Sequence, residues 1–167
     1  FSNLKHEIKI IRELYNEIWN MGNHPQQTEL TEREFDTIAM GIKAIALEEL
    51  IFIVEKDSKP VGISISLPDI NEVINEYDMG FLNRTGTGIS NYMPSDNFLS
   101  LKDLKRDIDI FNIIRSRLKE KKFQGTRILI LGVKEECRKT GMDSKLYFQT
   151  FKRGKELGFT HGSGSQL

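Results

Sequence analysis

The stretch Arg127-Ile-Leu-Ile-Leu-Gly-Val133 predicts a buried strand, because nearly all of its side chains are aliphatic. A polar loop from Lys134 to Thr140 follows, and Gly141 then opens a helix that Gly158 is placed to end. The apolar stripe expected on that helix consists of Met142, Leu146, Tyr147, Thr150 and Phe151. A strand that runs into a helix in this way indicates a sheet covered by helices.

The segments before this strand predict two helices and a hairpin. Apolar residues between Leu4 and Trp19 recur every three or four positions, which is typical of one helix face. Thr31, followed three residues later by Glu34, is a capping-box signature for a second helix. The β-branched runs 50–54 and 60–67 flank the polar turn 55–59, so they predict an antiparallel hairpin that Pro68 ends.

The middle of the chain predicts further helices and one irregular segment. Asp69 can cap a short helix that reaches about Tyr77, and helical spacing returns from Leu101 to Lys121. Residues 80–100 show no period, and we expect a mobile insertion or lid there. The order of elements predicts a single domain over 1–167 of the α/β or layered α+β class, with a mixed central sheet flanked by helices.

The composition excludes several classes of protein. The 167 residues include 24 Lys and Arg against 24 Asp and Glu, and this balance argues against a nucleic-acid surface. One cysteine, Cys137, cannot form an internal disulfide, and three scattered histidines do not indicate a metal site. No apolar run approaches the roughly 20 residues of a membrane span, so we expect a cytoplasmic protein without membrane contact. Since the chain begins at Phe1 and ends without a closing element, we also expect a longer polypeptide.

The turn at Gly141 has the composition of an anion site. The first amides of a helix lack internal partners, and the helix dipole adds partial positive charge there. Arg138 and Lys139 add two full charges, and Gly141 has no Cβ to obstruct a phosphate. The alternative is an ordinary scaffold in which Gly141 only makes the turn. Neither GxxxxGK[ST] nor GxGxxG follows a strand, so nucleotide binding at this helix is a third, less favoured interpretation.

A family resemblance favours the anion site over the ordinary scaffold. The segment Leu131-Gly-Val-Lys-Glu-Glu-Cys-Arg-Lys-Thr-Gly-Met-Asp-Ser-Lys-Leu-Tyr147 resembles motif A of the GNAT superfamily of acyl-CoA-dependent N-acyltransferases, [RQ]xxGx[GA]. Arg138 fills its first position and Gly141 its fourth, while Asp143 stands where Gly or Ala is usual. Most of residues 8–158, apart from 80–121, is also similar to the C-terminal half of a poorly characterised bacterial group with two GNAT-like halves.

The resemblance implies that the chain transfers an acyl group from acetyl-CoA, or another acyl-CoA, to a small-molecule or peptide amine. It implies a GNAT-like fold that lacks its C-terminal strands, and a second GNAT-like domain as a partner. Asp143 is expected to compete with the pyrophosphate for the helix amides. The implied coenzyme-binding residues are Leu131, Val133, Arg138, Lys139, Thr140, Gly141, Met142, Asp143 and Ser144.

Catalytic candidates are Glu135, Glu136 and His24, since acyl transfer to an amine needs a proton acceptor. All three also fit solvated surface positions. Asp69 and Asn71 are substrate-binding candidates whose alternative role is to cap a helix. Because Asp143 departs from the motif, a non-catalytic GNAT-like module that supports or regulates a partner domain is the competing function.

Overall fold

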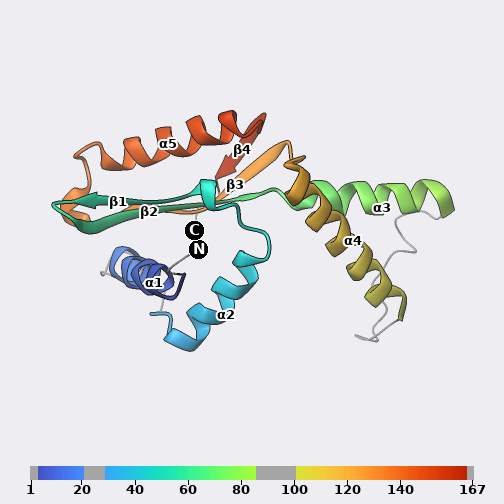
Figure 1. Ribbon diagram of the computed structural model, residues 1–167, viewed down its shortest axis with the longest axis horizontal. Coiled ribbons are helices and arrows are strands. Elements are labelled where there is room, and N and C mark those ends of the chain that lie inside the picture. Colours follow the sequence, from blue (N-terminus) through green and yellow to red (C-terminus); the bar gives the residue numbers. More distant parts are fainter. Residues whose placement is uncertain (1–3, 21–28, 86–100, 165–167) are drawn as a thin grey trace. The chain divides into compact units, whose positions relative to one another are not determined.

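The computed structural model describes residues 4–20, 29–85 and 101–164 (Figure 1). The sequence predicts one domain, whereas the structure groups the chain into two compact units. The first unit comprises 1–68 and 124–167, and the second comprises 69–123. The mixed sheet and all of the predicted coenzyme-binding residues belong to the first unit.

The first unit is built on a four-stranded sheet in the order β1-β2-β3-β4. Its strands are β1 (Ile51–Lys56), β2 (Lys59–Pro68), β3 (Gly125–Val133) and β4 (His161–Gly164). The first three strands are antiparallel neighbours, and β4 runs parallel to β3. The predicted hairpin is confirmed. Asp57 and Ser58 both have positive φ, as the tight turn of a twisted hairpin requires.

Helices cover both faces of this sheet (Figure 1). On one face lie α1 (Leu4–Asn20) and α2 (Glu32–Lys43), and on the other lies α5 (Met142–Glu156). A short 3-10 turn, η1 (Glu48–Leu50), leads into β1. Leu14 and Ile18 of α1 pack on Ile63 and Ile65, and the opposite core contains Val61, Val133, Cys137 and Leu146. The mixed sheet between helical layers agrees with the predicted fold class.

Two local features determine how closely α1 approaches the sheet and where α2 begins. An added Cβ at Gly132 would lie 2.7 Å from Trp19 Cη2 and 2.9 Å from Ile18 Cγ2, so only glycine lets α1 approach β3 this closely. The predicted capping box of α2 is present, because the Thr31 hydroxyl accepts from the Glu34 amide and the Glu34 carboxylate accepts from the Thr31 amide. Hydrogen bonds from Thr31 lower the pKa of Glu34.

The second unit contains α3 (Asn71–Thr85) and α4 (Leu101–Glu120). Arg106 of α4 bonds Asp78 through Nε at 3.0 Å and through a terminal nitrogen at 2.7 Å, and the Tyr77 hydroxyl donates to Asp109 at 3.1 Å. Helix α3 extends to Thr85, beyond Tyr77, its predicted end. The expected insertion or lid over 80–100 thus begins with helical residues at 80–85, while 86–100 lie outside the described residues.

The end of α5 and the strand after it also differ in part from expectation. Gly158 ends the helix as predicted, with φ +92°, the Phe159 amide donating to Gly154 and the Gly158 amide donating to Lys155. The chain was expected to finish without a closing element, but His161–Gly164 forms β4. The strand is rich in Gly and Ser and has no alternating apolar pattern, which is why periodicity did not reveal it.

Candidate functional site

The candidate site begins where β3 ends and α5 starts. Beyond Val133 the chain makes a short 3-10 turn, η3 (Glu135–Cys137), and reaches Gly141, the residue that precedes α5. Cys137 is only 1% exposed and packs with Val133 and Leu146, so it holds the loop against the hydrophobic core. The Thr140 hydroxyl donates to the Cys137 carbonyl at 2.6 Å. A buried thiol in this position is part of the core and does not meet the requirements of a nucleophile.

Two residues of the loop have a left-handed backbone. Lys139 has φ +59° and Gly141 has φ +83°. A Cβ at Gly141 would meet nothing within 4 Å, so the glycine is required by the conformation and not by lack of space. A non-glycine residue held in this region costs on the order of 1–3 kcal/mol, and such residues cluster at binding sites. Turns of this kind direct successive amides toward a common point, where they can hold an anion.

The first turn of α5 has amides available for a ligand. The first main-chain bond of the helix runs from the Lys145 amide to the Gly141 carbonyl at 3.0 Å, so the amides of Met142, Asp143 and Ser144 precede it. No described side chain caps this helix. Asp143 is exposed in this first turn, and its carboxylate does not cap the helix amides.

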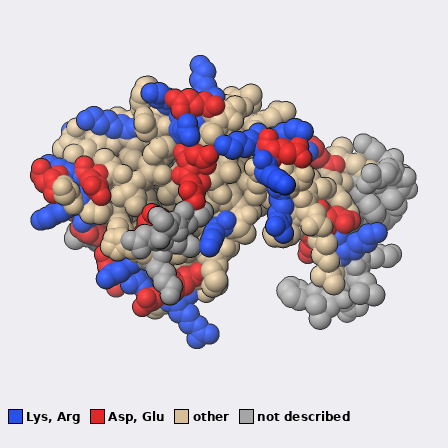
Figure 2. All heavy atoms as spheres, viewed as in Figure 1, with Lys and Arg blue, Asp and Glu red and all other residues tan. Residues whose placement is uncertain are grey.

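The charges around the loop are balanced. Arg138 and Lys139 are exposed, as predicted, and so are Glu135 and Glu136 in the preceding turn. Lys134 forms an ion pair with Glu17 of α1 at 2.6 Å. In the view of Figure 2, acidic and basic side chains are interspersed over the surface. Any affinity of this site for phosphate would thus depend on local main-chain geometry and on the two neighbouring cations.

The C-terminal half of β3 leads to this loop. Strand β4 pairs with β3 over Gly125–Ile128, and the residues after Gly164 lie outside the described ranges. Ile130 to Val133 pair with β2. This half of β3 ends at the loop that carries Arg138 and Lys139.

A bulge in β3 interrupts its pairing with β2. Ile65 of β2 lies opposite Ile130, while the next residue, Ser66, lies opposite Ile128, so Leu129 is the extra residue. The bulge borders a cavity of about 620 Å³ between the sheet, α1 and α2, and both Leu129 and Ile130 line it. Sequence reasoning missed the bulge and the cavity, because neither has a local sequence signal.

The other predicted residues are placed as follows. His24 lies outside the described residues. Asp69 Oδ1 accepts from the Asn71 amide at 3.1 Å and from its side chain at 2.8 Å, the contacts of a helix start, and both residues belong to the second unit. Ser144 lines a groove of about 560 Å³ between α5 and β1. Met142 is half-buried against the core that contains Val133.

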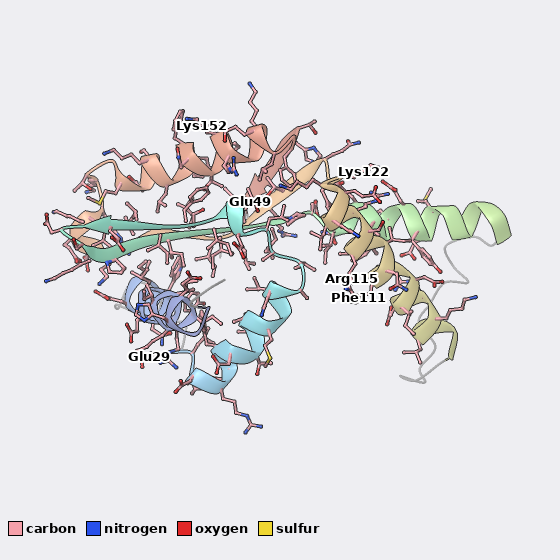
Figure 3. All side chains as sticks on the ribbon, in the orientation of Figure 1. Glu29, Glu49, Phe111, Arg115, Lys122 and Lys152 are labelled. Atoms are coloured by element: carbon pink, nitrogen blue, oxygen red, sulfur yellow. The ribbon has the colours of Figure 1, made fainter. Side chains whose placement is uncertain are left out.

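The predicted stripe of α5 is only partly buried. Leu146 and Thr150 are buried as expected, but Tyr147 and Phe151 are each 47% exposed, so the expectation that Tyr147 belongs to the core is wrong. Their rings lie 4.9 Å apart on the flank of the helix. Gly154 is also buried on this face, where an added Cβ would lie 3.9 Å from Thr126 Cγ2, an ordinary contact. Lys152 lies on the exposed side of α5 (Figure 3).

Within the described ranges, no three His, Cys, Asp or Glu side chains lie close enough to share a metal ion. None of the described helices has both the length and the apolar content to cross a bilayer.

Comparison with known proteins gives one limited similarity. No family model matches the chain. It is 39% identical over 70 residues to Protein YghO of Escherichia coli (strain K12), and the match covers 41% of this chain and 17% of that protein. The chain thus spans much less than two thirds of YghO, whose name states no activity. The function has to be argued from the site itself.

Proposed function

We propose that the chain is an N-acyltransferase of the GNAT type, which transfers an acetyl group directly from acetyl-CoA to an amine. The observation that carries the proposal is the glycine-led helix that follows the central strand β3, whose first amides have no side-chain cap. Within the first unit, the order of two helices, a hairpin, a central strand, a helix and a parallel strand supports it; α3 and α4 of the second unit stand between the hairpin and the central strand.

Each part of the coenzyme has a matching feature. The amides of Met142 to Ser144, with Arg138 and Lys139 beside them, suit a pyrophosphate. The main chain of β3 from Leu129 to Val133 suits the pantetheine arm, because the amide groups of the arm can pair with main-chain groups of a strand. Amides of the same segment suit the developing oxyanion of the thioester carbonyl.

The reaction needs a neutral amine. Its nitrogen attacks the thioester carbon, a C–N bond forms, the C–S bond breaks, and the proton lost by the amine balances the departing thiolate. Glu135 and Glu136 follow β3 and are exposed, so either carboxylate can pass that proton to water. Catalysis in this scheme comes chiefly from orientation and from main-chain donors.

Calorimetric titration of acetyl-CoA into the full chain tests the proposal. Gly141→Ala forces a side chain onto a φ of +83°, and we expect it to weaken binding at least tenfold. Gly158→Ala is the matched control, because φ is +92° and space is equally open there, but it lies at the other end of α5. Absence of heat at about 1 mM acetyl-CoA, a weak affinity near −4 kcal/mol, would contradict the proposal.

A non-catalytic module remains the second candidate, and Asp143 favours it. A carboxylate in the first turn of α5 repels a phosphate at the same helix end. The transferase proposal predicts that Asp143→Ala binds acetyl-CoA more tightly than the natural chain. A module without coenzyme would show no binding in either form.

A further inference from the structure

The second unit contains a helix with apolar side chains on two of its faces. Ile110 and Ile114 of α4 are buried, on the side of the helix that bonds α3. Leu104, Ile108 and Phe111 of the same helix are 56%, 51% and 46% exposed. A surface helix is normally apolar on one face only, whereas a helix that is apolar all round is buried. The second face of α4 therefore has the composition of an interaction surface.

The exposed residues have the spacing of a seam between two helices. Leu104, Ile108, Phe111 and Arg115 follow one another at intervals of four, three and four, which is the a/d spacing of a heptad. The Arg115 guanidinium lies over the Phe111 ring, 5.8 Å from its centre, so both side chains belong to one side of α4 (Figure 3). A stripe of about three turns matches the face of another helix.

Charges beside the seam select the direction of a second α4 helix. Arg115 lies at one end of the stripe, and the Asp107 side chain, 69% exposed, lies beside its other half. In a parallel pair, each of these two residues would face its own copy, and like charges repel. An antiparallel pair instead places Ile108 of one copy opposite Phe111 of the other. Arg115 then lies opposite Leu104 and, because helical side chains lean toward the N-terminus, reaches toward Asp107.

The contacts that Asp107 and Arg115 make inside the chain leave both accessible to a partner. Arg106 lies 3.3 Å from Oδ1 of Asp107, but it bonds both oxygens of Asp78, at 3.0 and 2.7 Å. An exposed ion pair such as that of Asp107 contributes little and can be exchanged for another. Arg115 is exposed, and a guanidinium that lies over a ring keeps its N–H donors at the edge, where a carboxylate can bind.

We propose that α4 pairs antiparallel with α4 of a second copy of this chain, in a two-fold symmetric dimer. Leu104, Ile108 and Phe111 of the two copies form its apolar seam. An ion pair between Arg115 of one copy and Asp107 of the other closes each half, because two-fold symmetry makes every contact occur twice. The surface is small, so the dimer should dissociate on dilution. It lies in the second unit and does not depend on the proposed transfer reaction.

Sedimentation equilibrium of the full chain tests the proposal, over a range of about 5 to 500 µM. We expect the average mass to rise from 19.3 kDa toward twice that value as the concentration increases. A chain that stays monomeric over this range would overturn the proposal.

Single substitutions place the interface on α4. Ile108→Lys and Phe111→Lys each put an ammonium group into the apolar seam near Arg115, and should weaken the dimer roughly tenfold or more. Both positions are half exposed, so the helix content measured by circular dichroism should be kept. Phe148→Lys is the matched control, since Phe148 is an exposed aromatic residue of α5 in the first unit. A dimer that survives both α4 variants, or that Phe148→Lys dissociates, would contradict the assignment to α4.

An exchange of charges tests the antiparallel direction. Asp107→Arg alone places two guanidinium groups together across the seam, and Arg115→Asp alone places two carboxylates together, so each should weaken the dimer several-fold. The double variant Asp107→Arg/Arg115→Asp brings opposite charges together again and should recover most of the loss. Losses in the single variants without recovery in the double variant would rule out the proposed pairing.

A lipid surface is the other occupant that the experiment distinguishes. Lys105 and Lys119 are exposed on α4, and basic residues beside an apolar face also suit an anionic membrane. The probe is a vesicle of phosphatidylcholine and phosphatidylserine. A chain that remains monomeric and co-sediments with these vesicles would overturn the dimer in favour of a membrane. Dimer formation without vesicle binding would support the proposal.

Discussion

The contact between α1 and β3 can be tested at Gly132. A methyl group at this position would lie 2.7 Å from Trp19 Cη2, 3.2 Å from Trp19 Cζ2 and 2.9 Å from Ile18 Cγ2. Overpacking of this kind costs about 1–3 kcal/mol. For a chain of this length, each kcal/mol lowers the melting temperature by roughly 2–4 °C. We therefore expect Gly132→Ala to melt roughly 3–10 °C below the natural chain, measured by circular dichroism.

A double-mutant cycle assigns this cost to the tryptophan. Trp19→Phe removes the ring atoms nearest to the new methyl, so Gly132→Ala should cost less in that background, by at least about 0.5 kcal/mol. Gly41→Ala is the control, because it should raise the stability of the chain. It lies in α2 with nothing within 4 Å, and alanine there should stabilise by roughly 0.5–1 kcal/mol. An unchanged melting temperature for Gly132→Ala, or the same cost in both backgrounds, would refute the close packing of α1 on β3.

Further predictions concern buried hydroxyls and an ion pair. Ser64 and Ser66 are both fully buried, but Ser64 bonds Thr150 at 2.8 Å while Ser66 Oγ has no partner among the described residues. In denaturant titrations, Ser64→Ala should lose about 1 kcal/mol and Ser66→Ala should lose nothing or gain slightly; equal losses would contradict this assignment. Hydrogen bonding from Arg117 lowers the pKa of Glu76 from 4.5, so the pair stabilises the chain above that pH and the contribution is lost as the pH falls below it. Because the Glu76 side chain is 62% exposed, the effect is below about 1 kcal/mol. In Arg117→Met, the free energy of unfolding should fall less steeply as the pH drops below about 4.5. Arg115→Met is the control, because the Arg115 guanidinium lies over Phe111 on the same helix (Figure 3), and it should leave this pH dependence unchanged. The same change in both variants would argue against the Glu76 pair.

Much of the fold could be predicted where local chemistry decides the structure. The capping box at Thr31, the polar turn after Val54 and the stop at Gly158 are each set by a few neighbouring residues, and all three were predicted. Helix α3 was predicted too short, because contacts with α4 hold it beyond Tyr77. These contacts join residues about 30 positions apart, and no window of sequence contains both partners.

Some features of the candidate site could likewise be predicted from local sequence, and others could not. The glycine-led turn between β3 and α5 could be read from Gly141, because a left-handed residue at a helix start is a local requirement. The bulge at Leu129 and the cavity beneath α1 and α2 arise from register and packing between distant segments. The apolar residues of α1 and α2 were expected to fill a core, and periodicity cannot distinguish a filled core from a lined cavity.

Amide hydrogen exchange with and without acetyl-CoA tests the central claim most directly, because the ligand is proposed to bind main-chain groups. The account predicts slower exchange in two places, the end of β3 from Leu129 to Val133 and the first turn of α5 from Met142 to Ser144. Exchange elsewhere, including the start of α3 at Asn71, should be unchanged. Saturating acetyl-CoA that leaves both segments unprotected, or protects a different surface, would contradict the account.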